Sequence, residues 1–161
     1  MDKKKKCLVV LSWSAVIICA SVIFLLSHQP GDDSKELSVS LRDGLFSRIF
    51  DALGVSENML RTAAHWAEYC GLGLLSFNAF RQSKNRLPFF GAFVFCAAYS
   101  VTDEIHQIFV PGRAFQFVDI GVDCFGAVVG VFFCFLIYSL ISFFRQRMKT
   151  SERTGGNDKE E

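Results

Sequence analysis

Three stretches of apolar sequence contain clusters of ionisable and amide side chains. Most residues within a cluster are three or four positions apart, which places them on one face of a helix. The clusters comprise His65, Glu68 and Tyr69, then Asp103, Glu104, His106 and Gln107, and finally Asp119 and Asp123. Histidines beside carboxylic acids can act as general acids and bases. One cation, Arg113, follows the tight turn predicted at Pro111-Gly112, between the second and third clusters.

Full ionisation of these clusters would be untenable in a low-dielectric site. Five carboxylates face one arginine, which gives a charge of about minus four if both histidines are neutral. Some acids must be protonated, or the histidines charged, or a metal ion bound by imidazole and carboxylate groups. No spacing here is diagnostic of a metal site, so we expect proton sharing between His and Asp or Glu, and the sequence defines no cofactor.

The elements that carry these clusters are predicted to be transmembrane helices. The chain has 161 residues, 51% of them hydrophobic, which is more apolar surface than a soluble core of this size could bury. Apolar runs of about 20 residues match a hydrocarbon core of about 30 Å. We therefore expect an all-α integral membrane four-helix bundle, with helices over residues 7–27, 62–80, 87–110 and 117–144. A cleaved signal peptide is the competing interpretation of residues 1–27, but the uncharged run is too long and no A-x-A site follows.

The depth of the ionisable groups supports one site. At 1.5 Å per residue, five of the ionisable residues lie about 5–10 Å inside the outer ends of their helices: His65, Glu68, Asp103, His106 and Asp123. Two or three such residues could simply stabilise helix packing through interhelical hydrogen bonds. A layer of this size favours a functional site, because each charge inside a bilayer costs several kcal/mol.

The distribution of Lys and Arg predicts the orientation. Of 17 such residues, 12 lie before the first run, between the second and third, or after the fourth. Both termini are then expected in the cytoplasm. Residues 1–6 form a basic cytoplasmic N-terminus, residues 7–144 the transmembrane domain, and residues 145–161 a polar cytoplasmic tail that is expected to be disordered.

Three further patterns concern packing. Leucine or isoleucine recurs every fourth position from Leu37 to Leu53, which predicts an amphipathic helix on the outer interface; the alternative is a partly ordered loop on the bundle. Gly126 and Gly130 form a GxxxG motif that favours close helix packing within the bundle. The six cysteines lack CxxC or metal-ligand spacing, so we expect free thiols that act as small apolar side chains.

The strings HWAEYCGLGLL and SVTDEIHQIFVPGRAFQFVDIGVDCFGAVVG, with FLLSHQPGDDS at the end of the first helix, resemble the VanZ-like family. That family has an H-x-x-E-Y element, a D-E-x-H-Q-x-F-x-P-x-R element and a D-x-x-x-D-x-x-G element. The likeness covers about residues 20–140, and Trp66 departs from the Phe that commonly follows the first His.

The resemblance implies a bacterial membrane protein whose namesake is associated with resistance to the glycopeptide antibiotic teicoplanin, but it does not define a reaction. It also implies which residues form the site. Carried over by motif, the candidate catalytic residues are His65, Glu68, Asp103, His106 and Asp123, and the candidate substrate-binding residues are Tyr69, Glu104, Gln107, Arg113 and Asp119.

Three classes of function remain open at this point. The first is an enzyme acting on a lipid or lipid-linked cell-envelope substrate at the outer leaflet, with His65 or His106 as acid or base and Arg113 holding an anionic headgroup. The second is a non-catalytic membrane protein that binds an envelope lipid, an antibiotic or a protein partner. A transporter fits least, because the inner halves of the helices carry few polar residues. No nucleic-acid partner is expected.

Overall fold

The computed structural model describes residues 3–30 and 56–157, and over these residues it contains four helices and no strand. The helices are α1 (Lys3–Ser27), α4 (Glu57–Gln82), α5 (Pro88–Gln107) and α6 (Phe117–Asn157). The all-α prediction is therefore confirmed. Residues 33–53, for which an interfacial helix is predicted, lie outside the described residues.

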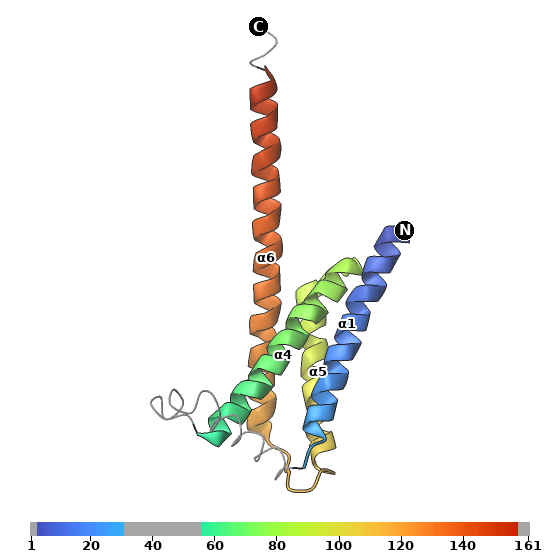
Figure 1. Ribbon diagram of the computed structural model, residues 1–161, viewed down its shortest axis with the longest axis vertical. Helices are drawn as coiled ribbons and strands as arrows, with labels where there is room; N and C mark the ends of the chain where they lie inside the picture. Colours follow the sequence, from blue (N-terminus) through green and yellow to red (C-terminus); the bar gives the residue numbers. More distant parts are fainter. Residues whose placement is uncertain (1–2, 31–55, 158–161) are drawn as a thin grey trace, which may run out of the picture.

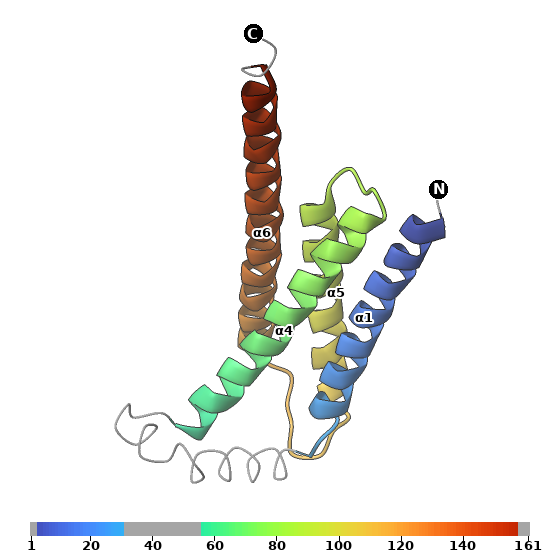
Figure 2. The same ribbon diagram turned by 45° about the horizontal axis from the view of Figure 1, so that its top comes forward.

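Helix α4 is the centre of the arrangement, because it packs against α1, α5 and α6. Its interface with α6 is the most extensive of the bundle, whereas α1 and α5 contact each other only slightly. Helices α1 and α5 run opposite to α4 and α6, so α1 begins and α6 ends at the same end (Figure 1). Figure 2 shows α1, α4 and α5 side by side, with α6 extending beyond them. We call the end where α1 and α5 stop and α4 and α6 begin the lower end.

Local sequence explains where α4 begins and ends. Ser56 is its N-cap and accepts a hydrogen bond from the Met59 N–H at 3.3 Å. At the other end the Ser83 hydroxyl donates to the Ala79 carbonyl oxygen at 2.8 Å. Lys84 has a φ of 57°, a left-handed conformation that a helix cannot continue. These features fix the short connection to α5, which starts at Pro88.

Helix α5 ends at Gln107, three residues before the predicted boundary. The Val110 N–H donates to the Gln107 carbonyl oxygen, so the chain tightens into turns after the helix. Val110 precedes Pro111, which disfavours helical backbone at that position. The Arg113 N–H then donates to the Val110 carbonyl oxygen at 3.2 Å, and Gly112 has a φ of 75°. Proline and a positive-φ glycine at the two central positions are the signature of a type II turn, which confirms the tight turn predicted here.

Helix α6 continues to Asn157, whereas a helix ending at residue 144 and a disordered tail were predicted. The predicted boundary is too early because it follows the end of the apolar run and not the end of helix-forming sequence. Residues 145–154 contain no Gly or Pro and several good helix formers. Helix length and membrane-compatible length are therefore different quantities in this helix, because its apolar run ends at Phe144, before Arg145 and Arg147.

Glycines bring the backbones of α4 and α6 into contact. A Cβ atom added at Gly126 would overlap the Trp66 carbonyl oxygen, and one at Gly130 would overlap the Cys70 carbonyl oxygen. Gly73 on α4 meets the backbone of Ala127 in the same way. The GxxxG motif therefore packs within the bundle, as predicted. Contacts pair early residues of α4 with early residues of α6, as expected for two helices that run in the same direction.

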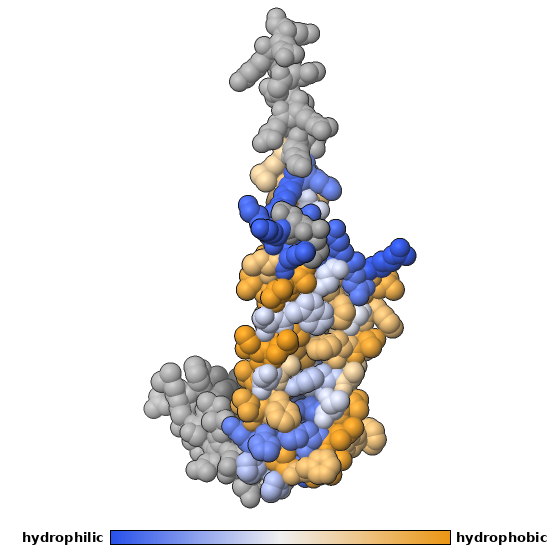
Figure 3. All heavy atoms as spheres, turned by 90° about the vertical axis from the view of Figure 1, so that its right-hand side faces the viewer, coloured by the Kyte–Doolittle hydropathy of each residue, from blue (hydrophilic) through white to orange (hydrophobic). Residues whose placement is uncertain are grey.

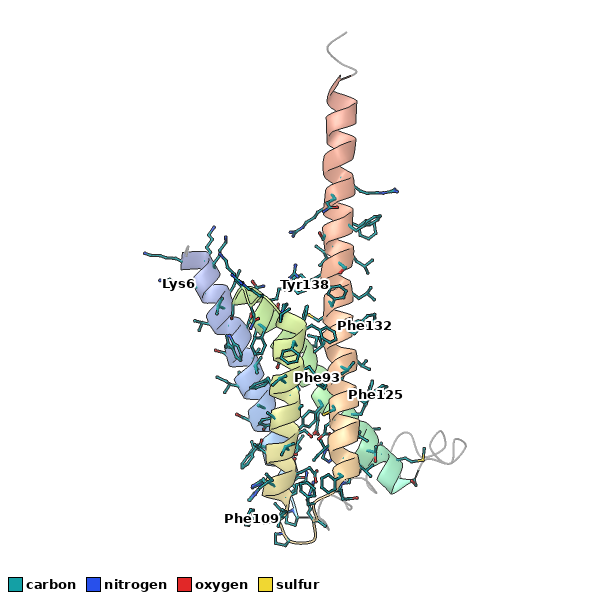
Figure 4. All side chains as sticks on the ribbon, turned by 180° about the vertical axis from the view of Figure 1, so that it is seen from behind. Lys6, Phe93, Phe109, Phe125, Phe132 and Tyr138 are labelled. Carbon is teal, nitrogen blue, oxygen red and sulfur yellow. The ribbon has the colours of Figure 1, made fainter. Side chains whose placement is uncertain are left out.

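The outer surface of the bundle is largely apolar. Large hydrophobic side chains are exposed along α1, α5 and α6, and Figure 3 shows such side chains over the middle of one face with hydrophilic residues toward its ends. Phe125 and Phe132 point away from the bundle (Figure 4). Within the described residues, α1 and the Phe117–Met148 part of α6 are long and apolar enough to cross a membrane. Helices α4 and α5 carry the two larger polar clusters, and Asp119 and Asp123 lie near the start of α6. The six cysteines are free, with Cys96 and Cys134 buried and Cys7 exposed.

Candidate functional site

A histidine and an aspartate meet at the α4–α6 interface near the lower end. Nδ1 of His65 lies 3.7 Å from Oδ1 of Asp123. His65 is 8% exposed and Asp123 is fully buried. The other oxygen of Asp123 accepts a hydrogen bond from the Ser100 hydroxyl of α5 at 2.7 Å. One carboxyl group thus joins three helices, and it sits where it can orient the imidazole.

A second carboxyl group joins α5 to the end of α1. Oδ2 of Asp103 accepts hydrogen bonds from the Ser27 hydroxyl at 2.7 Å and from the Gln107 side-chain amide at 3.3 Å. All three side chains are buried. Ser27 is the last residue of α1, so this contact fixes the lower end of α1 against α5.

Glu68 lies within electrostatic range of both carboxyl groups, those of Asp123 and Asp103. It interacts electrostatically with His65, Asp103, Asp123 and Arg113, which belong to α4, α5, α6 and the α5–α6 connection. Its side chain is half-buried. Of the predicted catalytic residues, Glu68 is therefore within electrostatic range of His65, Asp103 and Asp123.

The remaining acids lie beside the connection to α6. Glu104 is fully buried, and its Oε2 accepts a hydrogen bond from the Gln116 N–H at 2.8 Å, just before α6 begins. Asp119 lies in the first turn of α6, where the helix dipole favours a negative charge, and its charge reaches His65 and Glu104. Tyr69 is fully buried, with its ring 6.2 Å from that of Tyr99.

Arg113 binds the end of α1. Its Nε donates to the Gln29 carbonyl oxygen at 3.0 Å and its Nη2 to the Leu26 carbonyl oxygen at 3.4 Å. A cation on these carbonyls stabilises a helix C-terminus. Burial lowers the pKa of Arg113 below its ordinary value, and the charge of Arg61 lowers it further. The arginine therefore has a structural contact that the sequence prediction, which assigned it to an anionic ligand alone, did not include.

His106 lies on a different side of α5 from the residues that face α4 and α6. Its Nε2 is 3.2 Å from Nδ1 of His28, and the two rings stack with centroids 5.3 Å apart. The ring of Phe24 lies 4.4 Å from that of His106. Although His106 is only three residues from Asp103, the structure places it against α1 and the residue that follows it. It therefore lies at the edge of the polar layer, by which we mean the polar side chains at the lower end of the bundle.

Three contributing residues were not predicted: Ser27, His28 and Ser100. Ser27 and His28 stand in the string FLLSHQPGDDS, which carries part of the family resemblance, but no role was assigned to them. Ser100 precedes Asp103 by three residues, so helical spacing alone could have placed it on the face of the acids.

Seven buried polar atoms of the described residues have no hydrogen-bond partner, and all belong to this layer. They are His65 Nδ1, Tyr69 Oη, Asp103 Oδ1, Glu104 Oε1, Gln107 Oε1, Arg113 Nη1 and Asp123 Oδ1. Both donors and acceptors are among them. Leaving such a group unsatisfied costs about 1–3 kcal/mol, so this concentration needs a compensating role.

A polar network at the upper end provides an internal comparison. The Tyr138 hydroxyl donates to the Asn78 carbonyl oxygen at 2.6 Å, and the Asn78 amide donates to the Ser12 hydroxyl at 3.1 Å. The Gln82 amide donates to the Tyr138 hydroxyl at 3.3 Å. This network joins three helices through hydrogen bonds between its side chains, as expected for polar groups that stabilise helix packing. The lower layer differs, because it is larger and incompletely paired.

The metal alternative receives no geometric support from the part of the chain that the structure describes. Within residues 3–30 and 56–157, no three His, Cys, Asp or Glu side chains are placed to hold one metal ion. The unpartnered atoms instead form a mixed set of donors and acceptors. Such a set suits a ligand that hydrogen-bonds and exchanges protons.

Comparisons with known proteins agree with the motifs. No curated protein and no solved structure matches the chain. The VanZ/LLP1 family matches residues 12–141, a range that contains every residue of the lower polar layer. Together with the two apolar helices, this match makes the chain a membrane protein. The protein belongs to the VanZ/LLP1 family.

Proposed function

We propose that this protein crosses the bacterial cell membrane four times and acts on the headgroup of a lipid or lipid-linked cell-envelope molecule at the outer leaflet. The observation that supports it most is the set of seven unpartnered buried polar atoms at the lower end. The hydrogen-bonded network at the upper end argues that adhesion between helices does not require unpaired groups. His65 Nδ1 and Asp123 Oδ1 face each other at 3.7 Å, and a polar ligand would satisfy the other five groups at the lower end.

Placement of the lower end on the outer side follows from charge. Lys3–Lys6, Arg81, Lys84 and Arg86 all lie at the opposite end of the bundle, which the positive-inside rule assigns to the cytoplasm. The polar layer then lies at the depth of outer-leaflet headgroups and the upper part of their acyl chains.

In the proposed reaction His65 is the general acid and base. Asp123 faces its Nδ1 and would hold that nitrogen in its protonated tautomer, which leaves Nε2 as the nitrogen that exchanges a proton with the substrate. Ser100 fixes the rotamer of Asp123 through its hydrogen bond. Arg113 would use its unpartnered Nη1 to hold a phosphate oxygen, while its other donors remain on α1.

The test compares membrane lipids from bacteria that express matched amounts of the wild-type protein, His65→Gln or Asp123→Asn. Ser21→Ala is the control, because Ser21 is exposed and donates only to the Ile17 carbonyl of its own helix. Mass spectrometry should find a lipid or lipid-linked species that the wild type and the control convert and that both site variants leave unconverted. The same strains grown with teicoplanin test whether the site contributes to resistance.

The alternative is a binding protein without catalysis. It predicts identical lipid profiles in all four strains, and lipid that copurifies with the wild type but in graded, smaller amounts with the two site variants. That result would overturn the enzymatic proposal and retain the site as a recognition surface. Equal copurified lipid in all four proteins would overturn both.

A further inference from the structure

A polar pocket lies at the upper end of the bundle, between the last turn of α4 and the facing side of α6. Its volume is about 380 Å³. It forms where α4 and α6 diverge above their close contact at Gly130 (Figure 1, Figure 2). Its lining comprises Arg81 of α4 and five residues of α6: Tyr138, Ser139, Ser142, Phe143 and Gln146. None of these residues belongs to the polar layer at the lower end, so this pocket is separate from the candidate site.

Arg81 is held at the pocket by an aromatic ring. Its guanidinium carbon lies 4.2 Å from the centre of the Tyr138 ring, which is a cation–π contact. The ring itself is fixed, because the Tyr138 hydroxyl donates to the Asn78 carbonyl oxygen and accepts from the Gln82 amide. The upper polar network therefore positions a guanidinium group in addition to joining helices.

The charge around the pocket is positive. The guanidinium carbon of Arg147 lies 5.6 Å from the centre of the Phe143 ring, and this ring lines the pocket. A second cation is thus placed at its edge. Every Asp and Glu side chain that the structure describes belongs to the polar layer at the lower end. No carboxylate among these side chains neutralises Arg81, so the pocket complements an anion.

Ser139 and Ser142 add hydroxyl groups to the pocket from within an apolar stretch of α6. Other serines of the bundle donate to the carbonyl oxygen four residues earlier, as Ser12, Ser21 and Ser83 do. Over the described residues, Ser139 and Ser142 make no such bond. Their hydroxyls are therefore free to donate to a ligand. Phosphate oxygens accept hydrogen bonds from guanidinium and hydroxyl groups alike.

The face of α6 that lines the pocket changes from apolar to polar along its length. Phe135, Ser139, Ser142 and Gln146 have the spacing i, i+4, i+7 and i+11, so they follow one another on this face. Phe135 is 46% exposed, and its ring contacts that of Phe77 on α4. A phospholipid has the same order, with apolar chains on one side of its phosphate. A free phosphate would leave the apolar part of this face without a partner.

We propose that this pocket binds the phosphate of an anionic phospholipid of the cytoplasmic leaflet, with Arg81, Ser139 and Ser142 as hydrogen-bond donors. Basic pockets between transmembrane helices on the cytoplasmic side recognise anionic headgroups in this way. A zwitterionic headgroup would bring a cation close to Arg81 and Arg147, where no described carboxylate could receive it. The inference uses the four-span placement of the proposed function but not its chemistry, and it concerns the opposite leaflet.

Native mass spectrometry can count the lipids that stay bound to the protein. The full-length delipidated protein in detergent is titrated with phosphatidylglycerol or with phosphatidylcholine, and the apparent Kd of the first bound lipid is measured. Phosphatidylglycerol should bind at least about fivefold more tightly. Arg81→Gln should weaken its binding by roughly fivefold, because one arginine at the headgroup is lost. Arg86→Gln is the matched control and should leave binding unchanged, since Arg86 lies in the α4–α5 connection and does not line the pocket.

A second pair of variants tests the hydroxyl groups. The double variant Ser139→Ala with Ser142→Ala should weaken phosphatidylglycerol binding by roughly three- to tenfold, because two donors to the phosphate are lost. Ser21→Ala is the control, since Ser21 donates to the Ile17 carbonyl oxygen of its own helix and does not line the pocket. Size-exclusion chromatography and helical circular dichroism verify that each variant is folded.

Inorganic phosphate separates the two sources of the phosphate group. At equal concentration it should not displace phosphatidylglycerol, because it lacks the chains that contact the apolar part of the α6 face. Displacement would overturn the assignment to a lipid. Equal binding of the two lipids by the wild type, or equal phosphatidylglycerol binding by Arg81→Gln and Arg86→Gln, would overturn the site itself. The effect of His65→Gln on membrane lipids is independent of these results, so the proposed function can fail while this site stands.

Discussion

Each key side chain of the site is held by a partner from another helix. Asp123 of α6 contacts Ser100 of α5 and His65 of α4, and Asp103 of α5 contacts Ser27 of α1. A change at one residue therefore acts on the orientation of a residue elsewhere in the sequence.

We expect Ser100→Ala to lower the free energy of unfolding in detergent by about 1–2 kcal/mol, because Asp123 would lose a hydrogen bond while it stays buried. Ser21→Ala is the control and should change stability by less than about 0.5 kcal/mol, since Ser21 is exposed. Chemical denaturation followed by circular dichroism measures both. Equal stability of the two variants would contradict the assigned role of Ser100.

Arg113→Lys should be destabilising despite its conserved charge. Lysine is a point charge and cannot reproduce the fork by which Arg113 contacts the carbonyl oxygens of Leu26 and Gln29 at once. We expect a loss of about 1 kcal/mol in the free energy of unfolding, and a larger loss for Arg113→Gln, which removes the charge as well. If Arg113→Gln lost lipid conversion at unchanged stability, the arginine would act on the ligand alone.

At the scale of elements, the α4–α6 contact determines where the site lies. The close approach at Gly126 and Gly130 sets the rotation and the register of the two helices, and thereby brings His65 opposite Asp123. The position of the polar pair is thus a consequence of this packing arrangement.

Gly130→Ala should separate these helices, because its methyl group would overlap the Cys70 carbonyl oxygen. Such overpacking costs about 1–3 kcal/mol, and the displaced backbone should also impair the His65–Asp123 pair. Gly121→Ala is the matched control on the same helix. It meets no atom within 4 Å and should be neutral or stabilising by up to about 1 kcal/mol. A melting temperature for Gly130→Ala that equals or exceeds that of Gly121→Ala would contradict this packing.

At the scale of the whole molecule, the even number of described helices places the start of α1 and the end of α6 at the same end (Figure 1). With the bias of Lys and Arg, this predicts that both termini are cytoplasmic. The outer end then carries the polar layer.

A reporter fused after Glu161 tests this orientation. Alkaline phosphatase, which is active only outside the cytoplasm, should be inactive there, whereas a fluorescent protein that folds in the cytoplasm should be bright. Fusions of the same two reporters within residues 111–116 serve as the opposite control. An active phosphatase after Glu161 would reverse the topology and with it the assignment of the site to the outer leaflet.

Much of this molecule follows from its sequence because helical geometry is local. Spacing alone placed His65 with Glu68 and Tyr69, and Asp119 with Asp123, on shared faces, and Pro111-Gly112 correctly predicted a tight turn. The motifs also identified the family correctly. The hydropathy pattern, however, predicted that the last helix ends at residue 144, whereas it continues to Asn157, because hydropathy measures apolar character and not helix formation.

Only the tertiary structure decided which faces meet. His106 shares a stripe with Asp103 in sequence, yet it contacts His28 at the end of α1, while Asp103 contacts Ser27. Arg113 was expected to contact a ligand, and the structure adds that two of its donors bind the carbonyl oxygens of Leu26 and Gln29 at the end of α1. Spacing defines the angle of a side chain around its own helix, whereas the partner of that side chain depends on the rotation and register of neighbouring helices. Those are fixed by backbone contacts such as that of Gly130 with Cys70, between residues far apart in the chain.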